Sequence, residues 1–209
     1  MAGRERLGVN RADLSIPEKQ ACAAIGQSFL MHTYEKAFEK KDIKVAQILL
    51  SHDDLGNRRR YLNAKHTIEA LLERNVIPII NENDSVTVEE IKIGDNDTLS
   101  ATVACLVDAQ LLIILSDVEG LFNRDPSSKI KGEKAELISH VGRVNEEIER
   151  TAGKSNNRLT VGGMYTKVLA AKKTMSFGIP TLVVNGLDEK VLENIFSGKE
   201  VGTLFWSGK

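Results

Sequence analysis

The sequence lacks long apolar runs, an excess of charge of either sign, and all but two cysteines, and each absence excludes a class of protein. Its longest strongly apolar stretch, Leu111–Leu115, has the length of a strand, whereas a helix needs roughly 20 apolar residues to cross a bilayer. The 28 basic and 29 acidic side chains leave a net charge of -1. This balance predicts no affinity for nucleic acid or for an anionic membrane.

Disulfides, metal ligands and a signal peptide also find no support. Cys22 and Cys105 lie far apart in segments with helical patterns, where thiols usually pack as small buried apolar groups. Met1–Leu14 is polar and lacks the apolar centre of a signal peptide. No metal-ligand spacing relates the four histidines, which are His32, His52, His66 and His140. We therefore expect a cytoplasmic protein with no metal site built from its own side chains.

What the sequence does have is an alternation of helical and strand patterns from end to end. With 209 residues, 42% apolar and 27% charged, the chain has the size and balance of one globular domain, or of one with a small extension. Strands separated by helices predict an α/β protein, a three-layer sandwich around a mostly parallel central sheet.

The expected elements follow from periodicity and from end signals. Ser15-Ile16-Pro17-Glu18 supplies a hydroxyl cap and a proline in a first helical turn. Residues 86–93 alternate and fit a hairpin or a flap. Helices are expected at 15–41, 57–75, 97–108, 145–151, 164–177 and 189–196. Strands are expected at 43–50, 76–80, 111–115 and 181–184, with a last edge strand at 202–206.

Two motifs rich in asparagine and aspartate lie close together in the sequence. Asn81-Glu82-Asn83-Asp84 follows the apolar strand at 76–80, and Gly94-Asp95-Asn96-Asp97 opens the helix after it. Amide groups donate to carboxylates and Asp84 can accept from an ammonium group, so the pair suits a zwitterionic amino acid. The alternatives are an Asx-rich turn for the first motif and a simple capped loop for the second, with Asp97 near the helix N-cap.

Two further motifs lie where ligands can bind. Ser116-Asp117-Val118-Glu119-Gly120-Leu121-Phe122 follows the strand at 111–115, and ligands bind beyond the carboxyl ends of parallel strands. Gly162-Gly163-Met164-Tyr165-Thr166-Lys167 places a glycine pair before a helix, whose N-terminus favours anions. It is neither a Walker A loop nor a dinucleotide fingerprint. The alternative interpretations are an ordinary polar turn and a glycine pair used for packing.

In this order and spacing, the four motifs resemble those of the glutamate 5-kinase group of the amino acid kinase family. The likeness extends to Gly3–Gly8, Tyr61–Ala64 and Val201–Phe205, and so covers nearly the whole chain. The resemblance implies the amino acid kinase fold. It also implies ATP-dependent phosphorylation of the side-chain carboxylate of L-glutamate, the first step of proline biosynthesis, with ATP and Mg²⁺ as cofactors.

The resemblance also implies roles for individual residues. Asp84 and Asn96 would hold glutamate, Asp97 would orient the catalytic lysines, and Lys167 would stabilise the transferring phosphoryl group. The same substrate pocket would be lined by Asn81, Asn83 and Asp95. The nucleotide site would comprise Ser116, Asp117, Val161, Gly162, Gly163, Met164, Tyr165, Thr166 and Lys167.

The chain departs from the family pattern at both ends. Family members begin with a lysine-bearing strand and a Gly-Ser turn, then a second strand that ends in a Ser-Gly-Ala turn, and this sequence starts after both. We therefore expect one amino acid kinase domain over residues 1–209 that lacks the first strands, with no C-terminal RNA-binding-like domain. The resemblance further implies a homo-oligomer inhibited by proline, and the charge balance predicts no nucleic-acid or membrane partner.

Two other functions remain open at this point. One is a non-catalytic relative that binds glutamate or nucleotide without transferring phosphate. The other is a related kinase acting on acetylglutamate, aspartate or a nucleotide, although Gly94–Asp97 favours glutamate as the acceptor.

Overall fold

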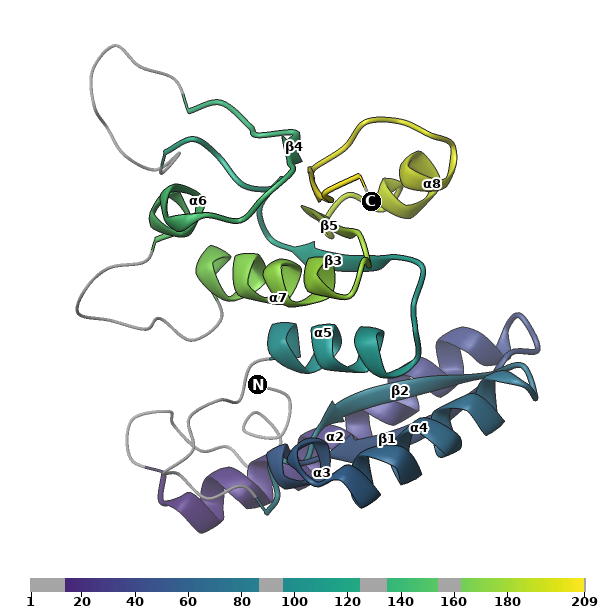
Figure 1. The fold of residues 1–209 in the computed structure, drawn as a ribbon. Helices are drawn as coiled ribbons and strands as arrows, with labels where there is room; N and C mark the ends of the chain where they lie inside the picture. The colour runs from purple at the N-terminus through teal and green to yellow at the C-terminus, as the bar shows by residue number, and fades with distance from the viewer. Residues whose placement is uncertain (1–13, 87–95, 125–134, 154–162, 209) are drawn as a thin grey trace. The chain divides into compact units, whose positions relative to one another are not determined.

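The computed structural model describes residues 14–86, 96–124, 135–153 and 163–208 (Figure 1). The chain forms two compact units, Met1–Gly94 and Asp95–Lys209, and each is described by itself. In the described part of the chain, no helix has the length and apolar character that spanning a membrane requires.

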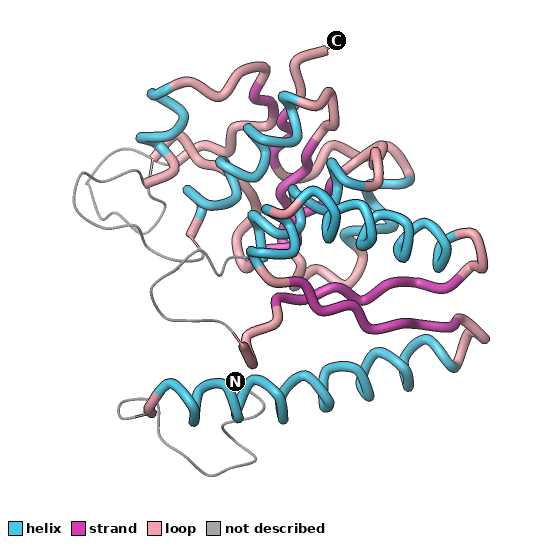
Figure 2. Tube along the Cα trace, turned by 60° about the horizontal axis from the view of Figure 1, so that its bottom comes forward, coloured by secondary structure: helices cyan, strands magenta, loops and turns pink. Residues whose placement is uncertain are grey.

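The first unit is built on two parallel strands. β1 (Lys44–Leu50) pairs with β2 (Val76–Glu82) over the full seven residues of each strand. The long helix α2 (Ile16–Glu39) and the helix α4 (Arg58–Leu72) lie on opposite faces of this pair, as Figures 1 and 2 show. A short helix, α3 (His52–Gly56), joins β1 to α4.

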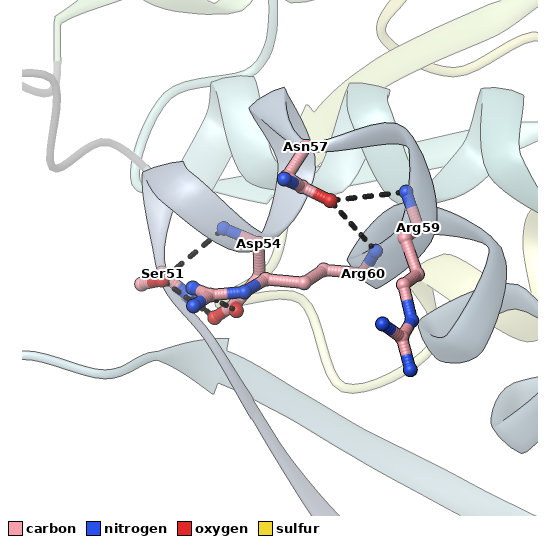
Figure 3. A network of polar contacts seen from close by, with 5 residues as sticks. All are labelled: Ser51, Asp54, Asn57, Arg59 and Arg60. Atoms are coloured by element: carbon pink, nitrogen blue, oxygen red, sulfur yellow. Dashed lines mark hydrogen bonds and ion pairs between the residues drawn. The ribbon is translucent and has the colours of Figure 1, made fainter.

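Side-chain caps fix where these helices begin. At the start of α2, the backbone N–H and the hydroxyl of Ser15 both donate to Glu18 Oε2, at 2.8 and 2.6 Å. These contacts form a capping box at the predicted helix start. Ser51 and Asp54 form a second capping box at α3, in which the backbone N–H and the hydroxyl of Ser51 donate to Asp54 Oδ2 (Figure 3). Asn57 Oδ1 then accepts from two backbone N–H groups of α4.

The second unit is built on a four-stranded sheet. Its strands are β3 (Leu112–Ser116), β4 (His140–Val141), β5 (Thr181–Asn185) and β6 (Thr203–Phe205). Their order in the sheet is β3-β5-β6-β4. The β3–β5 and β4–β6 pairs are parallel, and β5 and β6 are antiparallel. Together with β1–β2, most strand pairs are parallel, which confirms the predicted α/β class.

Helices cover the sheet of the second unit on both faces. The unit contains α5 (Asn96–Leu106), α6 (Glu146–Thr151), α7 (Met164–Ser176) and α8 (Val191–Phe196). Val183 of β5 belongs to a core cluster with side chains of α5 and α7. Its neighbours Leu182 and Val184 belong to a second cluster, with Val191 of α8. Val183 and its two neighbours belong to different clusters because successive side chains of a strand point to opposite faces of the sheet.

The structure corrects several details of the sequence prediction. The run at 202–206 is an interior strand, because β4 adds two residues beyond β6. β4 and α3 were not predicted. β2 continues through Glu82, so Asn81 lies in the strand and not in a turn. Asp97 is the second residue of α5 and not its N-cap.

Other predictions stand as made or lie outside the described residues. Cys22 and Cys105 are buried free thiols, as expected. The remaining predicted helices and strands are present, with ends that differ by a few residues. Most of the predicted hairpin or flap at 86–93 lies outside the described residues.

Candidate functional site

A largely buried ion pair lies at the start of α7 in the second unit. Lys167 Nζ lies 2.9 Å from Asp97 Oδ2, across 70 positions of sequence. The side chains of Lys167 and Asp97 are only 11% and 14% exposed. Because burying a lone charge is costly, each side chain needs the other, and the ammonium group is held at a fixed place.

The sequence positions both partners through helix starts. α5 begins at Asn96, which puts Asp97 in its first turn, and α7 begins after Gly163, which puts Lys167 one turn in. α5 and α7 both contribute side chains to the same core cluster, which fixes one helix against the other. A capping glycine has no side chain to bond the first N–H groups of α7, so this end of the helix suits an anion.

Thr166 adds a second donor to the same carboxylate. Its Oγ1 lies 2.8 Å from Asp97 Oδ2 and 2.7 Å from the carbonyl oxygen of Gly163. The hydroxyl has one proton, so it donates to one of these acceptors at a time. Asp97 Oδ2 therefore lies within reach of a hydroxyl and an ammonium group, both carried by the first turn of α7.

The third predicted motif lies at the carboxyl end of β3. Ser116 is the last residue of that strand and pairs with Asn185, and Gly186 N donates to its carbonyl oxygen at 2.7 Å. Ser116 Oγ lies 3.3 Å from Asp117 Oδ1, and Asp117 is exposed. These polar groups lie at the carboxyl end of a parallel strand, where ligands of open α/β sheets bind.

The first motif lies at the carboxyl end of β2 in the first unit. Asn81 Nδ2 donates to Gln27 Oε1 of α2 at 3.0 Å. Asn83 N donates to the carbonyl oxygen of Leu50 at 2.9 Å, which carries the strand pairing one step past β2. Ser85 Oγ then donates to Asn83 Oδ1 at 2.6 Å. The motif is therefore held on both sides, by a helix and by the adjacent strand.

Asp84 is the carboxylate of this motif. Nearby protein atoms remove part of its water, which raises the pKa of the Asp84 carboxyl above its ordinary value. The residue as a whole is exposed, so a ligand can still reach it. A cation beside the carboxylate would recover the lost solvation, as the ammonium group of an amino acid would.

The predicted site residues divide between the two units. Asn81, Asn83 and Asp84 belong to the first. Asp95, Val161 and Gly162 lie outside the described residues. The second unit carries Asn96, Asp97, Ser116, Asp117, Gly163, Met164, Tyr165, Thr166 and Lys167. Sequence reasoning missed Gln27, because a glutamine inside an amphipathic helix carries no signal of its own.

Comparison with known proteins identifies the family to which these features belong. The model of the Amino acid kinase family matches residues 3–185. The chain belongs to the amino acid kinase family. Two known structures share the family fold, the T. acidophilum isopentenyl phosphate kinase and the UMP kinase from Bacillus anthracis. Their TM-scores are 0.58 and 0.52, at 13% and 16% identity, over 97% and 99% of this chain and 77% and 74% of theirs.

Several curated relatives in the amino acid kinase family are far more similar in sequence. The glutamate 5-kinase of Geobacter sulfurreducens is 53% identical over 208 residues, which is 100% of this chain and 55% of the relative. The glutamate 5-kinase of Carboxydothermus hydrogenoformans is 50% identical over 208 residues, again 100% of this chain and 55% of the relative. The chain thus spans about half the length of the curated relatives it matches.

Proposed function

We propose that this chain carries the catalytic part of a glutamate 5-kinase. The reaction moves the γ-phosphoryl group of ATP onto the side-chain carboxylate of L-glutamate and yields L-glutamyl 5-phosphate, the first step of proline biosynthesis. The names of the relatives that match the whole chain support this activity. The buried Asp97–Lys167 pair at the start of α7 is the observation on which the proposal depends.

The chemistry of the acceptor explains why fixed positive charge matters here. A glutamate side chain has a reference pKa of about 4.3 and is already ionised near neutral pH, so its attack needs no general base. The barrier is electrostatic, because an anion approaches a polyanion and charge spreads over the transferred oxygens. A preorganised ammonium group and a helix N-terminus lower such a barrier without reorganising during the reaction.

Lys167 is suited to this role by the way it is held. An ammonium group has three N–H donors, and the ion pair with Asp97 takes one of them. The remaining donors are available to phosphate oxygens, and Asp97 keeps the group from swinging away. We assign Lys167 to the transferring phosphoryl group and Asp97 to the positioning of Lys167.

For L-glutamate, the proposed roles are assigned residue by residue, as the resemblance to glutamate 5-kinases implies. Asp84 accepts from the ammonium group of glutamate, and Asn96 donates to a carboxylate. Asn81, Asn83 and Asp95 are proposed as further glutamate-binding residues.

The nucleotide site is proposed on Ser116, Asp117 and the segment from Val161 to Lys167. Mg²⁺ bound with a nucleotide typically takes one or two carboxylates and the phosphates. We propose that Mg²⁺ binds the phosphates of ATP, where it would neutralise part of their charge.

Trapping the product tests the reaction directly. Hydroxylamine converts an acyl phosphate to a hydroxamate, so the chain is incubated with ATP, Mg²⁺, L-glutamate and hydroxylamine. Hydroxamate that depends on all three reactants supports the proposal. Calorimetry with L-glutamate alone measures binding separately from transfer.

Each other outcome identifies an alternative. Binding without hydroxamate indicates the non-catalytic relative, and hydroxamate with acetylglutamate but not with glutamate indicates the other kinase. Absence of both binding and hydroxamate refutes the proposal. We further propose a cytoplasmic location, where ATP is made available to biosynthesis, and a homo-oligomer, which sedimentation measures.

A further inference from the structure

Gln27 lies in the middle of α2 and reaches the carboxyl end of β2. Its Oε1 accepts the hydrogen bond from Asn81 Nδ2 at 3.0 Å, across 54 positions of sequence. The contact is partly buried. Because one amide end of Asn81 is occupied by this bond, its carbonyl oxygen is the end left as an acceptor for a ligand.

The other end of the Gln27 amide has no hydrogen-bond partner in the described part of the chain. Gln27 Nε2 is fully buried, and no acceptor for it exists among the described residues. A buried donor that loses water without gaining an acceptor is costly, and such groups in folded proteins usually mark an ordered water or a ligand. The nearest motif is the one that ends β2, which already carries the carboxylate of Asp84.

We propose that Gln27 is a binding and positioning residue of the amino-acid site. Through Oε1 it fixes the amide of Asn81, and through Nε2 it donates to a carboxylate oxygen of the bound amino acid. This inference rests on the proposed function, because it takes L-glutamate as the ligand. A carboxylate fits the unpaired donor well, since its two oxygens offer about four acceptor positions and a charge-assisted bond is stronger than a neutral one.

Three variants of the full chain separate a role in binding from a role in folding. Gln27→Met keeps the length of the side chain and removes both polar ends. Gln27→Glu keeps an acceptor for Asn81 and removes the donor, when measured well above the ordinary pKa of a carboxyl group. Gln20→Met is the matched control, since it makes the same change on α2 seven residues earlier, about 10 Å along the helix axis.

The readouts are the Kd for L-glutamate by calorimetry, the KM and kcat of hydroxamate formation, and the melting temperature. We expect Gln27→Met to raise Kd and KM for glutamate about tenfold, the loss of one hydrogen bond to a charged group. Gln27→Glu should weaken binding further, because it sets a negative charge against the carboxylate. Gln20→Met should leave Kd and KM unchanged, and all three variants should leave the KM for ATP unchanged.

The outcomes distinguish this inference from the proposed function. If the unaltered chain binds no L-glutamate, the proposed function fails and the inference falls with it. If the unaltered chain binds L-glutamate and both Gln27 variants bind it equally well, the inference alone is overturned. In that case Gln27 Nε2 holds a water, and a lowered melting temperature would show that the Gln27–Asn81 bond serves folding only.

Discussion

Replacing Asp97 and replacing Lys167 should destabilise the protein by unequal amounts. Two unit charges 2.9 Å apart attract by about 6 kcal/mol at an effective dielectric constant of about 20, before the cost of burial is subtracted. Removing one partner of a fully buried pair costs about 3–5 kcal/mol. The side chains here are 11% and 14% exposed, so some solvent remains and we expect about 2–3 kcal/mol at most.

The two single variants differ in what they leave behind. Lys167→Met leaves the Asp97 carboxylate with the Thr166 hydroxyl, 2.8 Å from Oδ2. Asp97→Asn leaves the Lys167 ammonium group with a neutral amide oxygen in place of the one carboxylate that contacts it among the described residues. Asp97→Asn should therefore destabilise the protein more than Lys167→Met. The double variant should lose less than the sum of the two, with a coupling of about 1–3 kcal/mol.

Activity should follow a different order from stability. Losing one preorganised donor typically slows a reaction by about 100- to 1000-fold, so Lys167→Met should lower kcat by that factor with a smaller change in the KM for glutamate. Asp97→Asn should also lower kcat, since the ammonium group is no longer held in place. Urea denaturation followed by circular dichroism measures stability, and hydroxamate formation measures kcat.

Lys172 provides a matched control on the same helix. Its Nζ lies 2.7 Å from Oε1 of Glu149, whose side chain is 7% exposed, whereas the Lys172 side chain is 53% exposed. Lys172→Met should therefore destabilise the protein without slowing the reaction. Full turnover in Lys167→Met would refute the role given to Lys167. Equal stability of Asp97→Asn and the unaltered chain would refute the electrostatic argument.

Two further predictions concern folding. Hydrogen bonds from Ser51 lower the pKa of the Asp54 carboxyl, so its contribution to stability is present above the unfolded pKa and is lost as pH falls through the folded pKa. Asp54→Asn should lower the free energy of unfolding by about 1 kcal/mol near neutral pH and by little in acid. Urea denaturation at several pH values measures this, and a difference between variant and unaltered chain that stays constant with pH would contradict it. Gly202→Ala should cost more than about 2 kcal/mol, because φ is 68° and the new Cβ would overlap the backbone oxygen of Val183. The control Gly198→Ala has φ 81° and open space, and should cost about 1 kcal/mol in the same denaturation assay; equal costs would exclude the steric explanation.

The sequence was informative about the fold wherever one element carries its own pattern. α2 was predicted from its cap and periodicity, and β2 and β3 from their apolar runs. β4 was missed because two residues are too few to show a period. Its pairing with β6 joins residues 64 positions apart, such as His140 and Leu204. For the same reason β6 was mistaken for an edge strand, since the position of a strand in a sheet depends on what pairs with it and not on its own residues.

The site shows the same division between local and distant information. The glycine at the start of α7 and the acidic first turn of α5 were visible as helix ends. Their meeting through Asp97 and Lys167 joins residues 70 positions apart, and the sequence suggested it only through resemblance to a family. The contact between Gln27 and Asn81 has no local signal at all, because glutamine is an ordinary residue in a helix.

The structure separates the two halves of Asn81–Asp84, because only the second half behaves as an Asx-rich turn. An Asx turn requires the side chain to bond to nearby backbone, but Asn81 lies in β2 and its amide bonds to α2. Asn83 behaves as a turn residue, because its carbonyl oxygen accepts from Val86 N at 3.2 Å and its Oδ1 from Ser85. A strand position fixes a side chain more tightly than a turn does. The first half of the motif is therefore suited to hold a ligand in one orientation, and the second half brings the carboxylate of Asp84 beside it.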